Sequence, residues 1–401
     1  MAVVAKNATA IPRSGIRDVF DRVEQIPDAI SLCLGEPGET ASAHVVEAAC
    51  EALKAGKTKY TDVLGIPEFR NAAAAYTRRV KGLDYNPETE IQAVDGATIG
   101  LYLAIKTVVD PGDEVIIPSP YFTSYDAEVL MCDAVPVTVA LKPEHGMHVN
   151  ADEIRKAITP RTRAIIINSP CNPTGAVTSA EELAEVAKLC EEFDLWVISD
   201  EVYHPFVFAS APDAQPEGDA VAPSIAAAEG MKDRTIVVES LSKTYAMTGW
   251  RIGYLLAPSH VIEQSSKIAE MMHSSINSSA QYGAIAALTG PQDHVLQMRE
   301  EYRAKRSLVL DALSDCEAVN LIEPQGAFYV FVDVRPTGLT SEEFSRKLLE
   351  EEKVAVVPGE AFGAEGSGFV RLSYAGNADD LKEAVTRMRK FALEQQAKHA
   401  M

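Results

Sequence analysis

The chain has few cysteines, no long apolar run and a shortage of positive charge. Lysine and arginine together number 37 against 58 aspartates and glutamates, which gives a formal net charge of −21. A chain this acidic is repelled by nucleic acid and by anionic membrane surfaces, so neither is expected as a partner. Any local group of Arg and Lys side chains is better suited to a small anion than to a polymer.

Targeting and redox signals are also missing. No segment reaches roughly 18 consecutive apolar residues, the length that would span a bilayer. The N-terminal stretch MAVVAKNATAIPRSG lacks the apolar core of a secretory signal. The six cysteines form no CxxC pair, as expected for free and mostly buried thiols in a reducing compartment. We therefore expect a cytoplasmic protein without a metal site.

What is present is the alternating pattern of an α/β protein. A chain of 401 residues is too long for one simple core and suggests two domains. Short, continuous apolar runs alternate with helical stretches, as in a mostly parallel sheet buried on both faces. The expected strands are EIQAV (90–94), EVIIP (114–118), RAIIIN (163–168), LWVIS (195–199), TIVVES (235–240) and GYLLA (253–257), with helices at 98–109, 124–132 and 179–193.

The character of the sequence changes after residue 290. A long charged helix precedes three apolar strands, at 327–334, 354–359 and 369–374, and a final helix follows. This mixture predicts a smaller α+β domain, on which the first 45 residues are expected to pack. The predicted domains are a large one at 46–290 and a small one made of 1–45 and 291–401. The Ala-, Pro- and Asp-rich segment 209–223 is predicted to be a surface loop.

Ligands of open α/β sheets bind beyond the carboxyl ends of the strands, so the residues that follow each strand are the candidates. Gly96 and Ala97 follow the first strand and could offer helix amides to an anion, although Thr98 could equally be a simple helix cap. Phe122 could stack on a planar ring or lie in the core. Asn172, in SPCNPTG, could contact a ligand or only form a turn.

Two further strand ends carry charge. Asp200 follows an apolar strand and needs a cation, a strong donor or a helix to cap. The stretch SLSKTYAMTGWR (240–251) brings two hydroxyls, a lysine and an arginine to the same edge. Helix amides, hydroxyls and arginine suit a phosphate, a carboxylate suits a ring nitrogen, and a lysine suits an aldehyde. Pyridoxal 5′-phosphate (PLP) is the cofactor whose binding requires all of these groups together.

At this point the sequence resembles the class I/II, fold-type-I PLP-dependent aminotransferases, and is most similar to the branch of prokaryotic aspartate and aromatic aminotransferases. The resemblance implies the PLP-transferase fold type I, with a mostly parallel seven-stranded sheet in the large domain and a smaller α+β domain. It rests on motifs in the order LGEP (34–37), KTKYTDVLGIPEFR (57–70), DGATIGL (95–101), SPYF (119–122), NSPCNPTGAV (168–177), SDEVY (199–203), SLSKTYAMTGWRIGY (240–254), PQGAFYVF (324–331) and GFVRLSY (368–374).

The resemblance implies three catalytic residues. Lys243 bonds to the cofactor aldehyde and later acts as the base, Asp200 pairs with the pyridine nitrogen, and Tyr203 bonds the ring oxygen together with Asn172. The cofactor-binding residues that it implies are Tyr60, Gly96, Ala97, Thr98, Phe122, Asn172, Asp200, Tyr203, Ser240, Ser242, Lys243 and Arg251.

Substrate binding is implied for Arg371, which would hold the α-carboxylate with help from Asn172 and the Gly35 backbone. FVRLSY alternates, so from the residues alone Arg371 could equally be a surface arginine. Tyr60 matches a tyrosine that reaches the phosphate of the other subunit, which implies a homodimer with shared active sites.

The implied reaction moves an amino group from an L-amino acid of the aspartate, aromatic or alanine type to a 2-oxo acid such as 2-oxoglutarate, by a ping-pong mechanism. A carbon–sulfur β-lyase would use the same residues, so it remains an alternative. A non-enzymatic ligand sensor is a more remote alternative, because the first 45 residues are too few for a winged helix and the acidic charge opposes DNA binding. No residue in MMHSSINSSAQYG (271–283) identifies the substrate.

Overall fold

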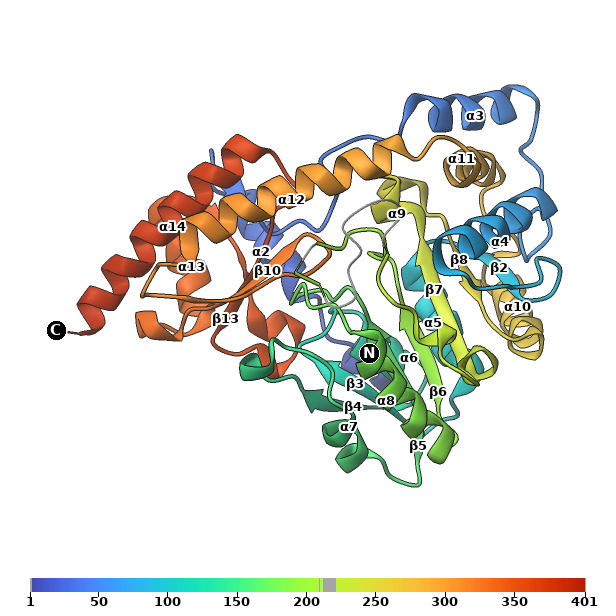
Figure 1. Ribbon diagram of the computed structural model, residues 1–401, viewed down its shortest axis with the longest axis horizontal. Coiled ribbons are helices and arrows are strands. Elements are labelled where there is room, and N and C mark those ends of the chain that lie inside the picture. The colour runs from blue at the N-terminus through green and yellow to red at the C-terminus, as the bar shows by residue number, and fades with distance from the viewer. Residues whose placement is uncertain (1, 209, 212–220, 401) are drawn as a thin grey trace.

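The computed structural model describes residues 2–208, 210–211 and 221–400. Its largest sheet has seven strands in the order β2-β8-β7-β6-β5-β3-β4, with helices on both sides (Figure 1). The strands of this sheet are β2 (Ile91–Val94), β3 (Glu114–Ser119), β4 (Val135–Ala140), β5 (Thr162–Asn168), β6 (Trp196–Asp200), β7 (Thr235–Ser240) and β8 (Gly253–Leu256).

The sheet confirms the predicted mostly parallel arrangement. Only β8 runs antiparallel to its neighbours β2 and β7, while the other adjacent strands pair in parallel. Six of the strands coincide with runs predicted from the sequence. The seventh, β4, was missed because it lies at the sheet edge, has mostly accessible residues and contains Pro136. Proline is tolerated on edge strands, where a missing N–H leaves no ladder bond unmade.

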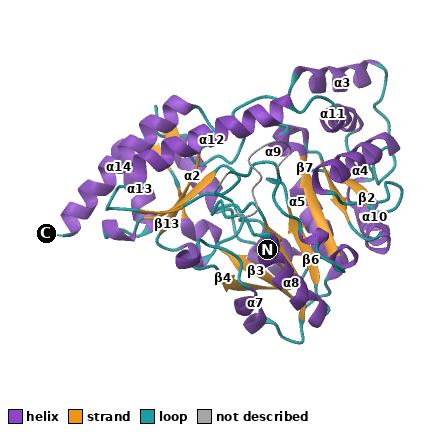
Figure 2. Cartoon of the chain, in the orientation of Figure 1, coloured by secondary structure: helices purple, strands orange, loops and turns teal. Residues whose placement is uncertain are grey.

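The continuous apolar runs arise because both faces of the sheet are covered. In β5, Ala164 and Ile166 belong to the core shared with α5 and α6, whereas Ile165 and Ile167 belong to the core shared with α7 and α8. Successive strand residues point to opposite faces, so a strand between two helical layers needs apolar residues at every position. Figure 2 shows the orange strands between purple helices. The helices of this part are α3 (Ala43–Lys54), α4 (Pro67–Lys81), α5 (Ala97–Val108), α6 (Tyr125–Met131), α7 (Ala151–Ala157), α8 (Ala180–Glu192), α9 (Leu241–Thr244), α10 (Ser259–His273) and α11 (Ser278–Thr289).

A second, smaller part contains a four-stranded sheet of order β12-β13-β10-β9. The long helix α12 leads into it from the large sheet, as the orange helix in Figure 1 shows. Its elements are α12 (Asp293–Leu313), β9 (Asn320–Ile322), β10 (Tyr329–Asp333), α13 (Ser341–Glu352), β11 (Val354–Ala355), β12 (Val357–Pro358), β13 (Phe369–Ser373) and α14 (Ala378–His399).

The N-terminal segment packs on this smaller part. It begins with α1 (Lys6–Ala10) and α2 (Gly15–Val23), and α2 contacts β12. Strand β1 (Ile30–Ser31) then pairs in parallel with β11. The expected packing of the first residues on the C-terminal part is thus present, while the exact domain limits at 45/46 and 290/291 stay a prediction.

Residues 209 and 212–220 lie outside the described residues, and most of the surface loop predicted for 209–223 falls among them. Within the described chain, no helix combines the length and the apolar character needed to cross a membrane. All six thiols are free, and five of them are buried, whereas Cys50 is exposed.

Candidate active site

A cavity of about 270 Å³ opens at the carboxyl ends of β5, β6 and β7, the sheet edge that the sequence predicts for ligand binding. Residues from the N-terminal segment, the large sheet and the smaller part all contribute to its wall. Its lining consists of Ile16, Leu34, Gly35, Ala97, Thr98, Leu101, Phe122, Asn168, Asn172, Asp200, Val202, Tyr203, Ser240, Ser242, Lys243, Thr248, Arg251, Tyr329 and Arg371.

One end of the cavity is suited to a phosphate. Helix α5 begins at Ala97, and its N-cap is Gly96 with φ 80° and no side-chain cap bond, so the amides of the first turn remain free for an anion. The alternative that Thr98 caps this helix is therefore wrong. A Cβ at Gly96 would overlap with the Arg251 guanidinium, which itself bonds the carbonyl oxygen of Thr248 at 2.9 Å. Because Gly96 has no Cβ, the Arg251 guanidinium can lie next to the free amides at the start of α5.

The hydroxyls at this end come from the turn after β7. Ser240 is the N-cap of α9, and its Oγ accepts a hydrogen bond from the backbone N–H of Ser242 at 3.0 Å. Both serines line the cavity together with Arg251. Two hydroxyls, a guanidinium and free helix amides make a donor set that matches a phosphate dianion.

Asp200 is buried with no ion pair within the described residues. The Tyr125 hydroxyl donates to its Oδ2 at 2.6 Å, and the backbone N–H of Val202 donates to its Oδ1 at 3.3 Å. Burial raises the pKa of Asp200 to about 6, although both hydrogen bonds favour the ionised form. A cationic ring nitrogen brought into the cavity would supply the missing charge partner.

Lys243 reaches the cavity from α9. Its Nζ donates to the carbonyl oxygen of Gly35 at 2.5 Å. Burial lowers the pKa of Lys243 to about 8, and the nearby cations Arg371 and Arg251 add to this effect while Glu36 opposes it. A buried amine with a lowered pKa has a far larger neutral fraction near physiological pH than a free lysine, so it can attack a carbonyl or accept a proton.

Arg371 projects from β13 and is only 1% exposed, so the alternative of a surface arginine is wrong. Its Nη1 donates to Oδ1 of Asn172 at 3.0 Å, and its Nη2 donates to the Cys33 carbonyl oxygen. The guanidinium carbon lies 4.6 Å from the ring centre of Tyr329 and 4.7 Å from that of Phe362. Its Nε–H finds no hydrogen-bond acceptor among the residues that the structure describes. A buried cation without a carboxylate fits an anionic ligand group.

The hydroxyl of Tyr203 also has a defined environment. It lies 2.8 Å from the hydroxyl of Tyr329, and both rings line the cavity. Since Oδ1 of Asn172 accepts from Arg371, the amide N–H groups of Asn172 remain available for another acceptor. Tyr203 and Asn172 can therefore both donate to one ligand oxygen.

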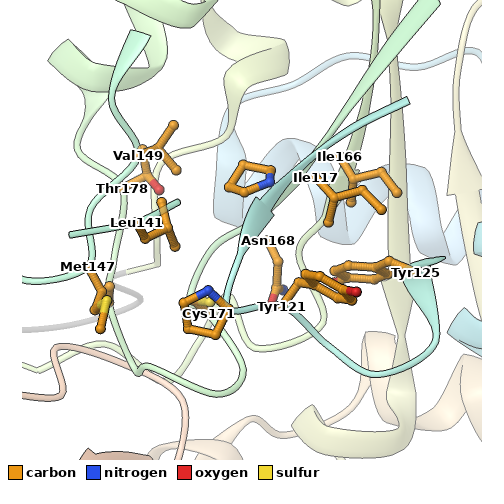
Figure 3. A pocket seen from close by; sticks show the side chains of 13 residues that line it. Ile117, Tyr121, Tyr125, Leu141, Met147, Val149, Ile166, Asn168, Cys171 and Thr178 are labelled. Atoms are coloured by element: carbon orange, nitrogen blue, oxygen red, sulfur yellow. The ribbon is translucent and has the colours of Figure 1, made fainter. Parts of the chain in front are cut away.

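A second and much smaller cavity lies behind Asn168 and is shown in Figure 3. It measures about 20 Å³, and apolar side chains such as Ile117, Leu141 and Ile166 form most of its wall. A space of this size accommodates about one water molecule. Figure 3 shows Asn168 between Cys171 and the rings of Tyr121 and Tyr125. Because Asn168 lines both cavities, it separates this space from the larger one, which alone of the two can hold a cofactor.

Of the residues predicted from the sequence, all but Tyr60 and Gly96 line the large cavity. Gly96 lies beside it, against Arg251. Tyr60 is 87% exposed and is absent from the cavity of its own chain. The sequence missed Tyr125 and Tyr329 as contributors. Tyr329 falls within the motif PQGAFYVF, one of those that carry the family resemblance, while nothing next to Tyr125 marks it as the partner of a residue 75 positions away.

Comparisons with known proteins agree with this geometry. The family model "Aminotransferase class I and II" matches residues 27–388. The chain belongs to this family. It is 41% identical to an aspartate aminotransferase of Pyrococcus abyssi and 40% identical to aromatic-amino-acid aminotransferase 2 of Thermococcus litoralis, each time over 95% of this chain and 96% of the relative.

Solved structures of the family superpose closely on this aminotransferase. The aromatic aminotransferase from Pyrococcus horikoshii gives a TM-score of 0.87 at 42% identity, covering 94% of this chain and 99% of that chain. The aspartate aminotransferase from Thermus thermophilus with maleate gives 0.90 at 36% identity, covering 98% and 100%. These similarities confirm the predicted PLP fold type I, the aminotransferase activity and the dependence on PLP.

The residues present fit that cofactor. The free amides at the start of α5, next to Gly96 and Arg251, suit its phosphate. The carboxylate of Asp200, which has no ion pair within the described residues, suits its ring nitrogen. The lowered pKa of the Lys243 amine suits bond formation with its aldehyde. Among the described residues, no group of three or more His, Cys, Asp or Glu side chains could hold a metal ion.

Proposed function

We propose that the large cavity is the site where this aminotransferase exchanges an amino group between an L-amino acid and a 2-oxo acid. The observation that carries the proposal is the arrangement of Lys243, whose buried amine lies in one cavity with a buried carboxylate and two arginines. When bound, PLP supplies an electron-accepting ring that makes the Cα–H of the substrate acidic. The individual roles of the chain's residues follow from their positions.

Lys243 acts as the general base. Its amine takes the proton from the substrate Cα and transfers it to the C4′ position of the cofactor. A base with a pKa of about 8 can do this near neutral pH. Asp200 keeps a proton on the ring nitrogen, because an adjacent carboxylate stabilises a cationic partner. Tyr203 and Asn172 donate to the ring oxygen and orient the ring.

Arg371 orients the substrate. Its guanidinium binds the α-carboxylate as a bidentate partner, with Asn172 and the Gly35 backbone beside it. Holding the carboxylate sets the direction of the Cα–H bond relative to Lys243, which is a contribution of geometry to the rate. The same residues serve both halves of a ping-pong cycle, since each substrate carries an α-carboxylate.

The lining also favours a class of donor. The cations of the cavity wall in the described chain are Lys243, Arg251 and Arg371, and each has a role in binding the cofactor or the α-carboxylate. The remaining wall includes the apolar residues Ile16 and Leu34. A side-chain carboxylate would lose water without gaining a cation there. We therefore propose neutral apolar or aromatic L-amino acids as the preferred donors.

The proposal extends to assembly and location. The exposure of Tyr60 supports a homodimer in which this side chain reaches the phosphate site of the other subunit. The free thiols support a reducing cytoplasmic location. No observation favours the lyase or sensor alternatives, and the relatives named above are aminotransferases.

The test is a donor panel with the purified PLP-loaded protein. Formation of 2-oxo acids would be measured with 2-oxoglutarate, oxaloacetate and pyruvate as acceptors. Transfer that strictly requires an acceptor supports the proposal. Pyruvate and ammonia released from a cysteine conjugate without any acceptor would contradict it in favour of the lyase.

A further inference from the structure

Next to the cavity lies a group of buried charges that the proposed reaction does not use. Lys81, at the end of α4, forms ion pairs with Glu201 and Glu239, and Nδ1 of His204 lies 3.1 Å from Oε2 of Glu239. The four side chains, here termed the Lys81 cluster, are each 2% exposed. We propose that the Lys81 cluster positions the two strand ends that bind the cofactor and sets the electrostatic potential at the cofactor ring.

The place of the cluster in the sheet carries the first step of the argument. Glu201 directly follows Asp200, and Glu239 directly precedes Ser240. The strands β6 and β7 are parallel neighbours, with Asp200 opposite Val238 and the N–H of Glu201 bonded to the Val238 carbonyl oxygen at 3.1 Å. A shift between these strand ends would move the ring-nitrogen partner relative to the phosphate serines.

The cluster and the site occupy opposite sides of the strand ends. Successive side chains of a strand alternate in direction, so Glu239 and Ser240 point to opposite faces of the sheet. Helix α4 packs on the face that Glu239 reaches, since its residues Phe69 and Tyr76 share a core with Val237 of β7. Lys81 therefore links α4 to the ends of β6 and β7 on the face of the sheet opposite the cavity.

Glu201 and His204 have further partners outside the cluster. Oε1 of Glu201 accepts from the hydroxyls of Ser199 at 2.7 Å and Ser224 at 2.6 Å. His204 contacts the Tyr76 hydroxyl at 2.9 Å. Such complete pairing fixes the geometry of the groups. Deeply buried ion pairs add little net stability compared with apolar residues of similar volume, so stability alone does not account for the cluster.

The charges of the cluster also reach Asp200. Attraction to the two glutamates outweighs burial and raises the pKa of Lys81, while His204 and Lys81 hold the pKa of Glu239 down despite its burial. Lys81 and Glu239 are thus both charged. The cluster pairs two glutamates with a single lysine, and both glutamates favour the protonated form of Asp200. Lys81 limits this negative potential near the ring.

The inference rests on the proposed PLP site and is tested on the holoenzyme with Lys81→Met, Glu239→Gln and the double variant. The first adds one net negative charge to the cluster, the second removes one, and the double variant has the wild-type net charge. Affinity for PLP would be measured by absorbance titration, together with the pH midpoint of the bound cofactor's visible absorbance. Circular dichroism melting reports folding, and Lys267→Met, in an exposed pair with Glu263, is the matched control.

We expect Lys81→Met to weaken PLP binding by about tenfold, because it leaves two buried carboxylates without their cation. It should raise the absorbance midpoint by about half a pH unit, since negative potential favours the protonated form, and Glu239→Gln should lower it. The double variant should return toward the wild-type midpoint, and Lys267→Met should change neither value.

A purely structural role predicts a different pattern. If Lys81→Met only lowers the melting temperature, with unchanged PLP affinity and midpoint, the inference is overturned. Should Lys81→Met fail to fold, Glu239→Gln decides, and a midpoint that does not fall would overturn the inference. A wild-type protein that takes up no PLP covalently would refute the proposed function and this inference together, whereas normal wild-type uptake with unaltered variants refutes this inference alone.

Discussion

The Tyr125 hydroxyl donates a hydrogen bond of 2.6 Å to the Asp200 carboxylate. Both groups are buried, and burial raises the pKa of Asp200 to about 6 even though this bond and the Val202 N–H both lower it. Hydrogen bonds to a charged group are worth roughly twice as much as neutral ones. The ability of Asp200 to remain ionised therefore depends on a tyrosine that does not line the large cavity.

Tyr125→Phe removes that donor. The pKa of Asp200 should rise further, and the carboxylate would then hold the protonated ring less well. We expect PLP affinity and kcat to fall about tenfold, the equivalent of roughly 1.5 kcal/mol for a lost bond to a charged group. Tyr121→Phe is the matched control, because its ring stacks on Tyr125 at 6.5 Å without bonding Asp200. Equal losses in the two variants would assign the effect to packing.

The lowered pKa of Lys243 predicts a pH dependence of cofactor uptake. Attack on an aldehyde requires the neutral amine, and burial makes the charged form costly, so the pKa falls from 10.5 to about 8. The rate of covalent PLP capture by the apoprotein should rise with pH around a midpoint near 8. Stopped-flow absorbance measures this rate. Lys243→Ala should show no borohydride-reducible product, and a midpoint near that of free lysine would refute the assigned environment.

Arg371→Lys keeps a positive charge but removes the fork that binds a carboxylate. We expect KM for amino and oxo acids to rise about tenfold or more, while the PLP dissociation constant stays within about twofold. Steady-state kinetics and an absorbance titration separate the two quantities. Arg335→Lys serves as the control, since Arg335 is an exposed arginine of the same part that pairs with Asp333. Unchanged KM values in Arg371→Lys would rule out the assigned role.

Gly96→Ala tests the proposed phosphate site formed by the start of α5 and Arg251. The new Cβ would overlap with the Arg251 guanidinium at a position with φ 80°, so the arginine must move away from the helix amides. We expect PLP affinity to fall by about tenfold or more, the loss of one charge-assisted contact. Gly112→Ala is the control, because it has φ 88° but nothing within 4 Å. It imposes comparable backbone strain without touching Arg251, and its cofactor affinity should stay near that of the wild type.

The apolar wall predicts donor preference. We expect kcat/KM for L-phenylalanine to exceed that for L-aspartate by about tenfold or more, because a side-chain carboxylate would be desolvated without a cation. Ile16→Arg should reduce this ratio by adding a cation to the lining, whereas Ile16→Gln should change it less. A wild-type preference for aspartate would show that a cation from outside this chain's lining completes the site.

The sequence predicted the sheet core and most of the cavity because both depend on local pattern. Continuous apolar runs reveal strands covered on two faces, and polar residues directly after them mark the binding edge. Strand β4 was not predicted, because most residues of this accessible edge strand are not buried and the apolar run is missing. The contacts of Tyr125 and Lys81 could not be predicted for another reason. Each acts through a partner more than 70 positions away, and nothing in its neighbours distinguishes it from an ordinary helix residue.

Strand β1 pairs with β11, so Ile30 lies opposite Val354 in a chain of 401 residues. Contacts between such distant segments slow folding, because a very large loop must close before they form. During synthesis, the N-terminal segment has no strand partner until nearly the whole chain has left the ribosome. The wall formed by Leu34 and Gly35, close after β1, and the wall formed by Arg371 of β13 are then completed late. Capture of the cofactor in its finished site should follow translation rather than accompany it.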